Sequence, residues 1–203
     1  MKVEQMFSPK EMRDLAISVL VIAFIFAYVY NGRNVATTIL TYPVFIVIVI
    51  FSFLAHELAH RYVGRKFGCV AYYEMSPLNL AFSFIASVVT GFVLLVPGHV
   101  TIKPFRFGRW GYRVAHLTMT EIGLISFVGP LTNLALGLFF RLFGNISSVF
   151  YILSYINAWL AFFNLIPVKP LDGAKILYWK HEAWFASMAI SFLLVLTFVI
   201  QSI

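Results

Sequence analysis

Charged residues are scarce in this chain. Lys, Arg, Asp and Glu make up 11% of its 203 residues, whereas a soluble globular domain carries about 25%. Hydrophobic residues make up 61%, and the mean hydropathy is +0.89. The composition excludes an ordinary soluble domain and is typical of a polytopic membrane protein. Because no long polar stretch interrupts the apolar ones, we expect a single integral-membrane domain over residues 1–203, surrounded by lipid bilayer.

Acidic residues and cysteine are scarcer still. The chain has 8 acidic and 15 basic residues, so its formal net charge is +7. The basic residues stand singly at the ends of apolar runs, a pattern that excludes nucleic acid as a partner and is typical of charge-driven membrane orientation. The single cysteine, Cys69, excludes an internal disulfide. The first apolar run is followed by Asn31 and Gly32 without a small-x-small site, so we expect no cleavable signal peptide.

Long apolar runs are what the chain has in abundance. They cover about residues 15–30, 43–60, 78–96, 121–140, 150–163 and 184–200. Before the first run, Ser8, Pro9 and Glu11 have the pattern of a capping-box helix start. The fold class that we predict is an all-α polytopic membrane protein with about five to six transmembrane helices.

The run at 78–96 decides the topology. If it does not fully cross, five crossings place every Lys and Arg except Arg33 and Arg141 on one side, which charge bias makes the cytoplasmic side. We therefore predict a re-entrant or membrane-embedded hairpin at about 77–102, although the run is long enough to cross. Its small polar residues recur at helical spacing and are interpreted as a helix-packing face: Asn79, Ser83, Ser87 and Thr90.

Near the end of the second run the sequence reads His56-Glu57-Leu58-Ala59-His60. On a helix, this HExxH pattern places two imidazoles one turn apart on one face, where both can bind one Zn²⁺. Glu57 then stands beside them, where it can take a proton from a water molecule. The alternative is a pair of structural histidines at a helix end with a snorkelling glutamate. Ionisable groups in an apolar span are costly, which favours the metal site.

A hydrolytic zinc site needs a third protein ligand. Asp172 is the strongest candidate, because it follows an apolar helix broken by Pro167 and Pro170, and irregular backbone at membrane depth must line a cavity or be buried in protein. The alternative for Asp172 is a helix cap for the segment starting near Ala174. The other candidates stand mostly in loops: His99, His116, His181, Glu74, Glu121 and Glu182.

Three motifs, in order, give the chain a resemblance to the site-2 proteases, the intramembrane zinc metalloproteases. They are His56-Glu57-x-x-His60, then Gly129-Pro130-Leu131-Thr132-Asn133, then Asn164-x-x-Pro167-x-x-Pro170-Leu171-Asp172-Gly173. Together they span a three-helix catalytic core from about residue 43 to 175. This joint pattern is far more specific than HExxH alone.

The resemblance implies one Zn²⁺ per chain, held by His56, His60 and Asp172, with Glu57 as general base. It implies that Asn133 and Asn164 support the site or hold the substrate; plain interhelical hydrogen bonding is the alternative for both. The expected reaction is hydrolysis of a peptide bond in or near a transmembrane helix of a membrane-protein substrate. The active site would lie within the bilayer of a cell membrane, nearer the cytoplasmic face. The chain has no room for the PDZ or CBS module that many members carry.

Two alternative functions belong to other classes of membrane protein. One is a different membrane zinc protease, HtpX-like or CAAX-processing, but such enzymes typically supply a glutamate ligand from another helix, in a pattern that this sequence lacks. The other is a metal transporter or an inactive metal-binding scaffold. A transporter needs ionisable groups on several spans, whereas Glu57 and Asp172 are the chief acids in apolar surroundings here. An inactive relative would be expected to have lost Glu57. The residues name neither the physiological substrate nor the oligomeric state.

Overall fold

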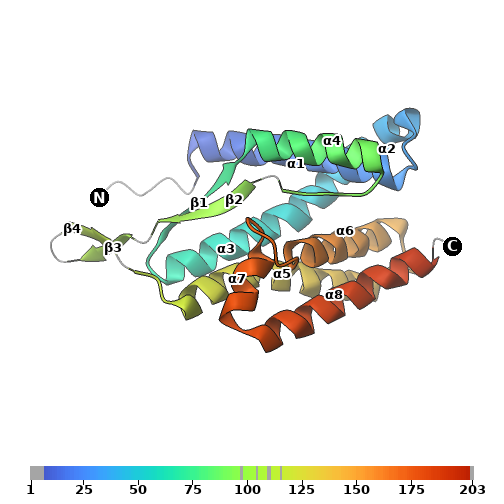
Figure 1. Ribbon diagram of the computed structural model, residues 1–203. Helices are drawn as coiled ribbons and strands as arrows, with labels where there is room; N and C mark the ends of the chain where they lie inside the picture. The colour runs from blue at the N-terminus through green and yellow to red at the C-terminus, as the bar shows by residue number, and fades with distance from the viewer. Residues whose placement is uncertain (1–6, 97, 104, 109–110, 115, 202–203) are drawn as a thin grey trace.

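The computed structural model describes residues 7–96, 98–103, 105–108, 111–114 and 116–201 (Figure 1). Helices dominate: α1 (Pro9–Tyr30), α2 (Val35–Val49), η1 (Ile50–Leu54, a π-helix), α3 (Ala55–Lys66), α4 (Pro77–Thr90), α5 (Met119–Arg141), α6 (Ser148–Asn164), α7 (Asp172–Trp179) and α8 (His181–Gln201). The strands form two antiparallel pairs, β1 (Val70–Met75) with β2 (Gly98–Lys103), and β3 (Phe105–Gly108) with β4 (Gly111–Val114).

The expected all-helical membrane fold is confirmed, with two short sheets added to it. Four helical segments are long and apolar enough to span a membrane: Pro9–Tyr30, Val35–Lys66, Met119–Arg141 and His181–Phe198. Large apolar side chains cover the outside of the molecule; Leu40 is 79% exposed and Leu78 is 80% exposed. A surface of this kind faces lipid rather than water.

Helix α6 is shorter, at 17 residues or about 25 Å, and it packs along α5 in the interior. It is apolar but shorter than the four segments that are long enough to span a membrane. One face of α5 approaches α6 closely. A Cβ added to Gly137 would lie 3.2 Å from the Ala158 nitrogen of α6.

The segment between β1 and β2 is a hairpin, as predicted. Met75 pairs with Gly98 across the sheet, so the chain leaves along α4 and returns to its starting point. Gly91 reverses the chain with φ of +75°, a left-handed conformation that favours glycine. Residue 97, where the sequence predicts a turn, lies outside the described residues.

The polar stripe of α4 binds an extended segment instead of another helix. The Ser83 hydroxyl accepts a hydrogen bond from the Val96 amide at 2.8 Å, and the Ser87 hydroxyl accepts one from the Leu94 amide at 2.9 Å. Both serines are buried. The returning chain has no sheet partner at this point, so these hydroxyls satisfy backbone groups that would otherwise be costly to bury.

Figure 1 shows α1 and α4 side by side in one layer, α5 to α8 in another, and α3 crossing between them. Ser8 caps α1 as expected, since its hydroxyl accepts the Glu11 amide. The capping-box prediction is wrong in its second half. The Glu11 carboxylate turns inward, binds the Arg61 guanidinium of α3, and accepts the Tyr73 amide at 3.0 Å. The first layer is thereby attached to the helix that carries the HExxH pattern.

This buried ion pair gives a test of the packing between the layers. Glu11→Ala removes the carboxylate that neutralises the buried Arg61, so we expect it to lower the free energy of unfolding by about 3–5 kcal/mol. The neighbouring Lys10→Ala breaks an exposed pair with Glu74, for which we expect a much smaller effect because solvent screens that pair. Thermal unfolding of both variants in detergent measures the difference; equal effects would contradict a role for Glu11 in joining the layers.

Candidate metal centre

Helix α3 places His56 and His60 on one face, four residues apart, and both side chains are buried. Their Nε2 atoms face each other at 2.9 Å. The His60 Nδ1–H donates to the main-chain carbonyl of Ile125 at 2.6 Å, and His56 Nδ1 lies 2.6 Å from Asn133 Oδ1. A carbonyl can only accept, so the hydrogen of His60 is on Nδ1 and its Nε2 lone pair faces the centre.

Asp172 completes this cluster from the start of α7. Its Oδ2 lies 3.4 Å from His56 Nε2 and 3.1 Å from His60 Nε2. The alternative role as a helix cap is not observed. Leu171 occupies the N-cap position of α7, and no side chain there makes a capping hydrogen bond. The acid instead points at the two imidazoles.

The cluster fits a zinc ion. Three electron-pair donors that face one point repel one another unless a cation lies among them. Their separations of 2.9, 3.1 and 3.4 Å are close to the edge of about 3.3 Å that tetrahedral zinc with bonds of about 2.0–2.1 Å requires. Two imidazoles and one carboxylate are also a donor set of catalytic zinc sites, which keep a fourth position open. The adjoining cavity encloses about 40 Å³, enough for a water-sized group.

Glu57 lines the same cavity and is buried. Its Oε2 has no hydrogen-bond partner among the described residues, an uncommon state for a buried carboxylate oxygen. Structural acids in proteins are normally paired or hydrogen-bonded. An unpaired oxygen beside the cluster is instead suited to receive a proton.

The two asparagines of the motifs lie at different distances from the cavity. Asn133 on α5 is fully buried and contacts His56 directly. Asn164, at the end of α6, lines the cavity and donates a hydrogen bond to the Leu160 carbonyl at 2.9 Å. Both positions are compatible with support of the site, and Asn164 can also be reached from the cavity.

Gly173 and Gly129 allow close packing around the cluster. A Cβ on Gly173 would overlap the Leu165 carbonyl, so the loop before α7 folds back closely on the end of α6. A Cβ on Gly129 would overlap His60 Nε2 and lie 2.7 Å from His56 Nε2. The bare backbone of α5 therefore leaves the space in which the ligand atoms meet.

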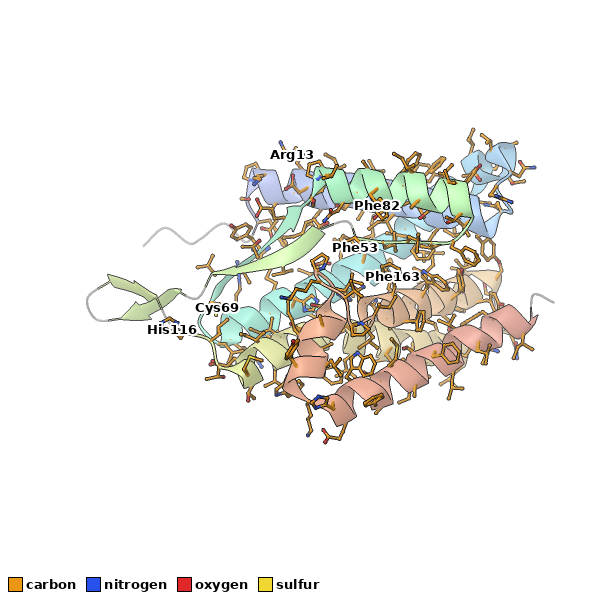
Figure 2. All side chains as sticks on the ribbon, in the orientation of Figure 1. Arg13, Phe53, Cys69, Phe82, His116 and Phe163 are labelled. Carbon is orange, nitrogen blue, oxygen red and sulfur yellow. The ribbon has the colours of Figure 1, made fainter. Side chains whose placement is uncertain are left out.

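The other candidate ligands are placed elsewhere. Glu74 pairs with Lys10, and the Glu121 carboxylate accepts from the Thr118 amide and hydroxyl at the start of α5. His116 is exposed and lies next to the β3–β4 hairpin, apart from the cluster (Figure 2). His181 and Glu182 are exposed at the start of α8, and the side chain of His99 lies outside the described residues.

Sequence reasoning missed two buried side chains that belong to the surroundings of His56. Asn157 of α6 and Ser52 of η1 are both fully buried and hydrogen-bonded to Asn133 or to each other. A signal was present for Asn157, because an amide in the apolar run at 150–163 is costly unless it has a specific partner.

Comparison with known proteins identifies the family of the chain. The model of "Peptidase family M50" matches residues 81–197, more than half of the chain. A protein of Methanocaldococcus jannaschii named "Putative zinc metalloprotease" is 37% identical over 185 residues, covering 88% of this chain and 88% of the relative. The chain belongs to peptidase family M50, the site-2 protease family.

Two further relatives of this M50 peptidase are more distant. A Bacillus subtilis protein, also named "Putative zinc metalloprotease", is 30% identical over 151 residues, covering 66% of this chain and 68% of the relative. A second M. jannaschii protein, named "Zinc metalloprotease", is 27% identical over 153 residues, covering 75% of this chain but 39% of the relative. No solved structure matches the chain.

The resemblance drawn from the three motifs is thus confirmed. The M50 peptidase is a multi-pass membrane protein and an intramembrane zinc metalloprotease of the site-2 type, with Zn²⁺ as its cofactor. Membership in this family argues against the HtpX-like, CAAX-processing and scaffold alternatives.

The contact at Gly129 gives a second test. We expect Gly129→Ala to weaken zinc affinity at least about tenfold, because the added methyl group would overlap His60 Nε2 and crowd His56 Nε2, two candidate ligand atoms. Gly137→Ala on the same helix is the matched control, since its Cβ would meet the Ala158 nitrogen and a Leu194 methyl group at 3.2 Å, away from the cluster. Zinc per purified chain and chelator competition measure both. Undiminished zinc binding by Gly129→Ala would contradict this placement of α5.

Proposed function

We propose that His56, His60 and Asp172 bind the single zinc ion of each chain and that Glu57 is the general base and acid of the hydrolysis. The convergence of Asp172 Oδ2 on the two Nε2 atoms carries this assignment. The lone Oε2 of Glu57 in the same cavity supports its role. Asn164 lines the cavity as a candidate substrate contact, while Asn133 acts through His56.

When bound, Zn²⁺ supplies Lewis-acid chemistry, polarising a carbonyl and making a coordinated water acidic near neutral pH. Glu57 takes the proton from the attacking water through Oε2 and later delivers it to the leaving amine. His56 and His60, each held through Nδ1, stay in the tautomer that keeps Nε2 free of hydrogen. The small cavity limits the amount of water that can compete with the substrate.

The proposed substrate is a transmembrane segment of another membrane protein. Its carbonyls are engaged in i→i−4 hydrogen bonds while it stays helical, so it must unwind locally before attack. The catalytic core that would act on it extends from about residue 43 to 175. It comprises α2, η1, α3, the two sheets with α4, α5, α6 and the start of α7.

The active site of the proposed enzyme lies within the bilayer, nearer the cytoplasmic face. His60 is followed within two turns of α3 by the basic residues Arg61, Arg65 and Lys66. In the five-crossing arrangement nearly all basic residues share that side, with Arg33 and Arg141 opposite. Positive charge is enriched on the cytoplasmic side of membrane proteins.

The assignment of Glu57 is tested by Glu57→Gln, which keeps the size of the side chain and removes its basicity. We expect about one zinc per chain in the purified wild type and in the variant, and cleavage of a transmembrane substrate at least about 100-fold slower in the variant. A wild type without zinc would overturn the ligand set. A variant that cleaves at the wild-type rate would overturn the role of Glu57.

The need for unwinding predicts a substrate preference. Replacing one Ala by Gly near the scissile bond lowers helix stability by about 1 kcal/mol, so we expect cleavage to rise about fivefold. The matched experiment compares two otherwise identical transmembrane substrates reconstituted with the enzyme in one detergent. An Ala-containing substrate cut as fast as the Gly-containing one would contradict local unwinding.

A further inference from the structure

A relay of buried hydrogen bonds, formed by Asn133, Asn157 and Ser52, leads from His56 away from the cavity through α5, α6 and η1. His56 Nδ1 contacts Asn133 Oδ1 of α5 at 2.6 Å. Asn133 Nδ2 donates to Asn157 Oδ1 of α6 at 2.8 Å and to the Ser52 carbonyl of η1 at 3.0 Å. Asn157 Nδ2 donates to Ser52 Oγ at 2.8 Å and to the Leu153 carbonyl at 2.8 Å.

The hydrogen bonds of this relay have one consistent donor-to-acceptor direction. The Leu153 and Ser52 main-chain carbonyls can only accept, so each fixes an amide nitrogen opposite it. Asn157 must therefore present Oδ1 to Asn133. Asn133 in turn donates both Nδ2 hydrogens, one to Asn157 and one to Ser52. Only Asn133 Oδ1 is left to face His56. Because that oxygen accepts, the His56 hydrogen lies on Nδ1 and its Nε2 lone pair points to Asp172 and His60.

We propose that Asn157 and Ser52 are positioning residues of the metal centre, which fix the amide orientation of Asn133 and through it the tautomer and direction of His56. The proposal rests on the role of His56 as a zinc ligand proposed above. Neither residue belongs to the three motifs of the family resemblance, and neither lines the cavity around the cluster.

Burial makes this orientation costly to change. Ser52, Asn133 and Asn157 are each 0% exposed, so water cannot replace a lost partner without opening the packing between η1, α5 and α6. Rotating the Asn133 amide by 180° would turn an NH₂ toward His56 Nδ1–H and an oxygen toward two acceptors. An unsatisfied buried polar group costs about 1–3 kcal/mol, and this rotation would create several.

In the π-helical turn η1, the Ser52 carbonyl accepts two hydrogen bonds. The Ser52 carbonyl accepts the Ala55 amide within the helix and also the Asn133 side chain, while the Ser52 hydroxyl donates to the Ile48 carbonyl at 2.9 Å. Ser52, one turn before His56, therefore contacts α5 through its carbonyl, and it contacts α6 through its hydroxyl, which accepts from Asn157. Isolated π turns inside α-helices are frequent at functional sites.

His60 lacks such a relay, since its Nδ1–H donates to the main chain at Ile125. Side-chain substitutions can therefore perturb His56 alone. This asymmetry makes the proposal testable, because one imidazole is expected to change its orientation while the other keeps its own.

The experiment measures zinc affinity by chelator competition and the visible absorption spectrum of the Co²⁺-loaded protein, with the full chain in detergent. We expect Asn157→Ala to weaken zinc affinity about 10–100-fold and to change the Co²⁺ spectrum. The matched control is Ser154→Ala, one turn earlier on α6. Ser154 is also fully buried and donates across the same α5–α6 interface, to the Gly137 carbonyl at 2.7 Å, without a link to His56.

The control separates positioning from general packing. If Asn157→Ala and Ser154→Ala change zinc affinity equally, or if the Co²⁺ spectrum of Asn157→Ala equals that of the wild type, the proposal is overturned. His56→Ala tests the underlying assignment separately. If it binds zinc as tightly as the wild type, His56 is no ligand; if it loses zinc while Asn157→Ala retains it, only the relay is wrong.

A double substitution provides a check that does not depend on how far one variant is destabilised. In an Asn133→Asp background either carboxylate oxygen can accept from His56, and the other carboxylate oxygen at that position would oppose Asn157 Oδ1. Adding Asn157→Ala should then cost little zinc affinity or restore some, the opposite of its effect in the wild type. An undiminished loss in that background would contradict the proposed direction of the relay.

Discussion

The close contact between α3 and α5 is the constraint on which the metal centre depends. The Nε2 atoms of His56 and His60 can face one point together with Asp172 only if the space above the α3 face is not filled by a side chain of the facing helix. Gly129 supplies that space, and its neighbourhood also supplies the acceptors for both imidazoles: the Ile125 carbonyl one turn earlier and Asn133 one turn later. A single face of α5 therefore leaves room for the ligands and directs them.

The same physical requirement operates throughout the interior. Inside an apolar protein in an apolar solvent, polar groups have to satisfy one another, because water is distant. Glu11 with Arg61, the α4 hydroxyls with the returning chain, and the relay behind His56 are three solutions to this problem. Against this background, Oε2 of Glu57 stands out among the described residues as a buried side-chain oxygen without a hydrogen-bond partner.

The hairpin that holds α4 forms one wall of the cavity beside the cluster. Gly98 and Val100 of β2 line the cavity, and β1 packs against α1 and α3. The sheet is joined to α1 by the Tyr73 amide on Glu11 and by the Tyr73 hydroxyl on Ser18 at 2.8 Å. Any movement of the first layer relative to α3 would therefore be transmitted to a wall of the active site.

The sequence by itself determined the membrane class, the helical spans and the family, because composition and motif spacing are local properties of the chain. It also pointed to Asp172 against six other candidate acids and histidines, since a carboxylate after a proline-broken apolar helix is costly without a use. The α4 stripe was recognised as a contact face, but its partner, a returning extended segment, depends on a chain reversal at Gly91. Glu11 shows the same limit, because local pattern favoured a cap while a buried guanidinium 50 residues later in the chain competed for the carboxylate. Only the tertiary structure decided which way the Asn133 amide faces and that Asn157 and Ser52 stand behind it. Hydrogen-bond direction depends on which donors and acceptors meet in space, and those three residues come from helices far apart in the sequence.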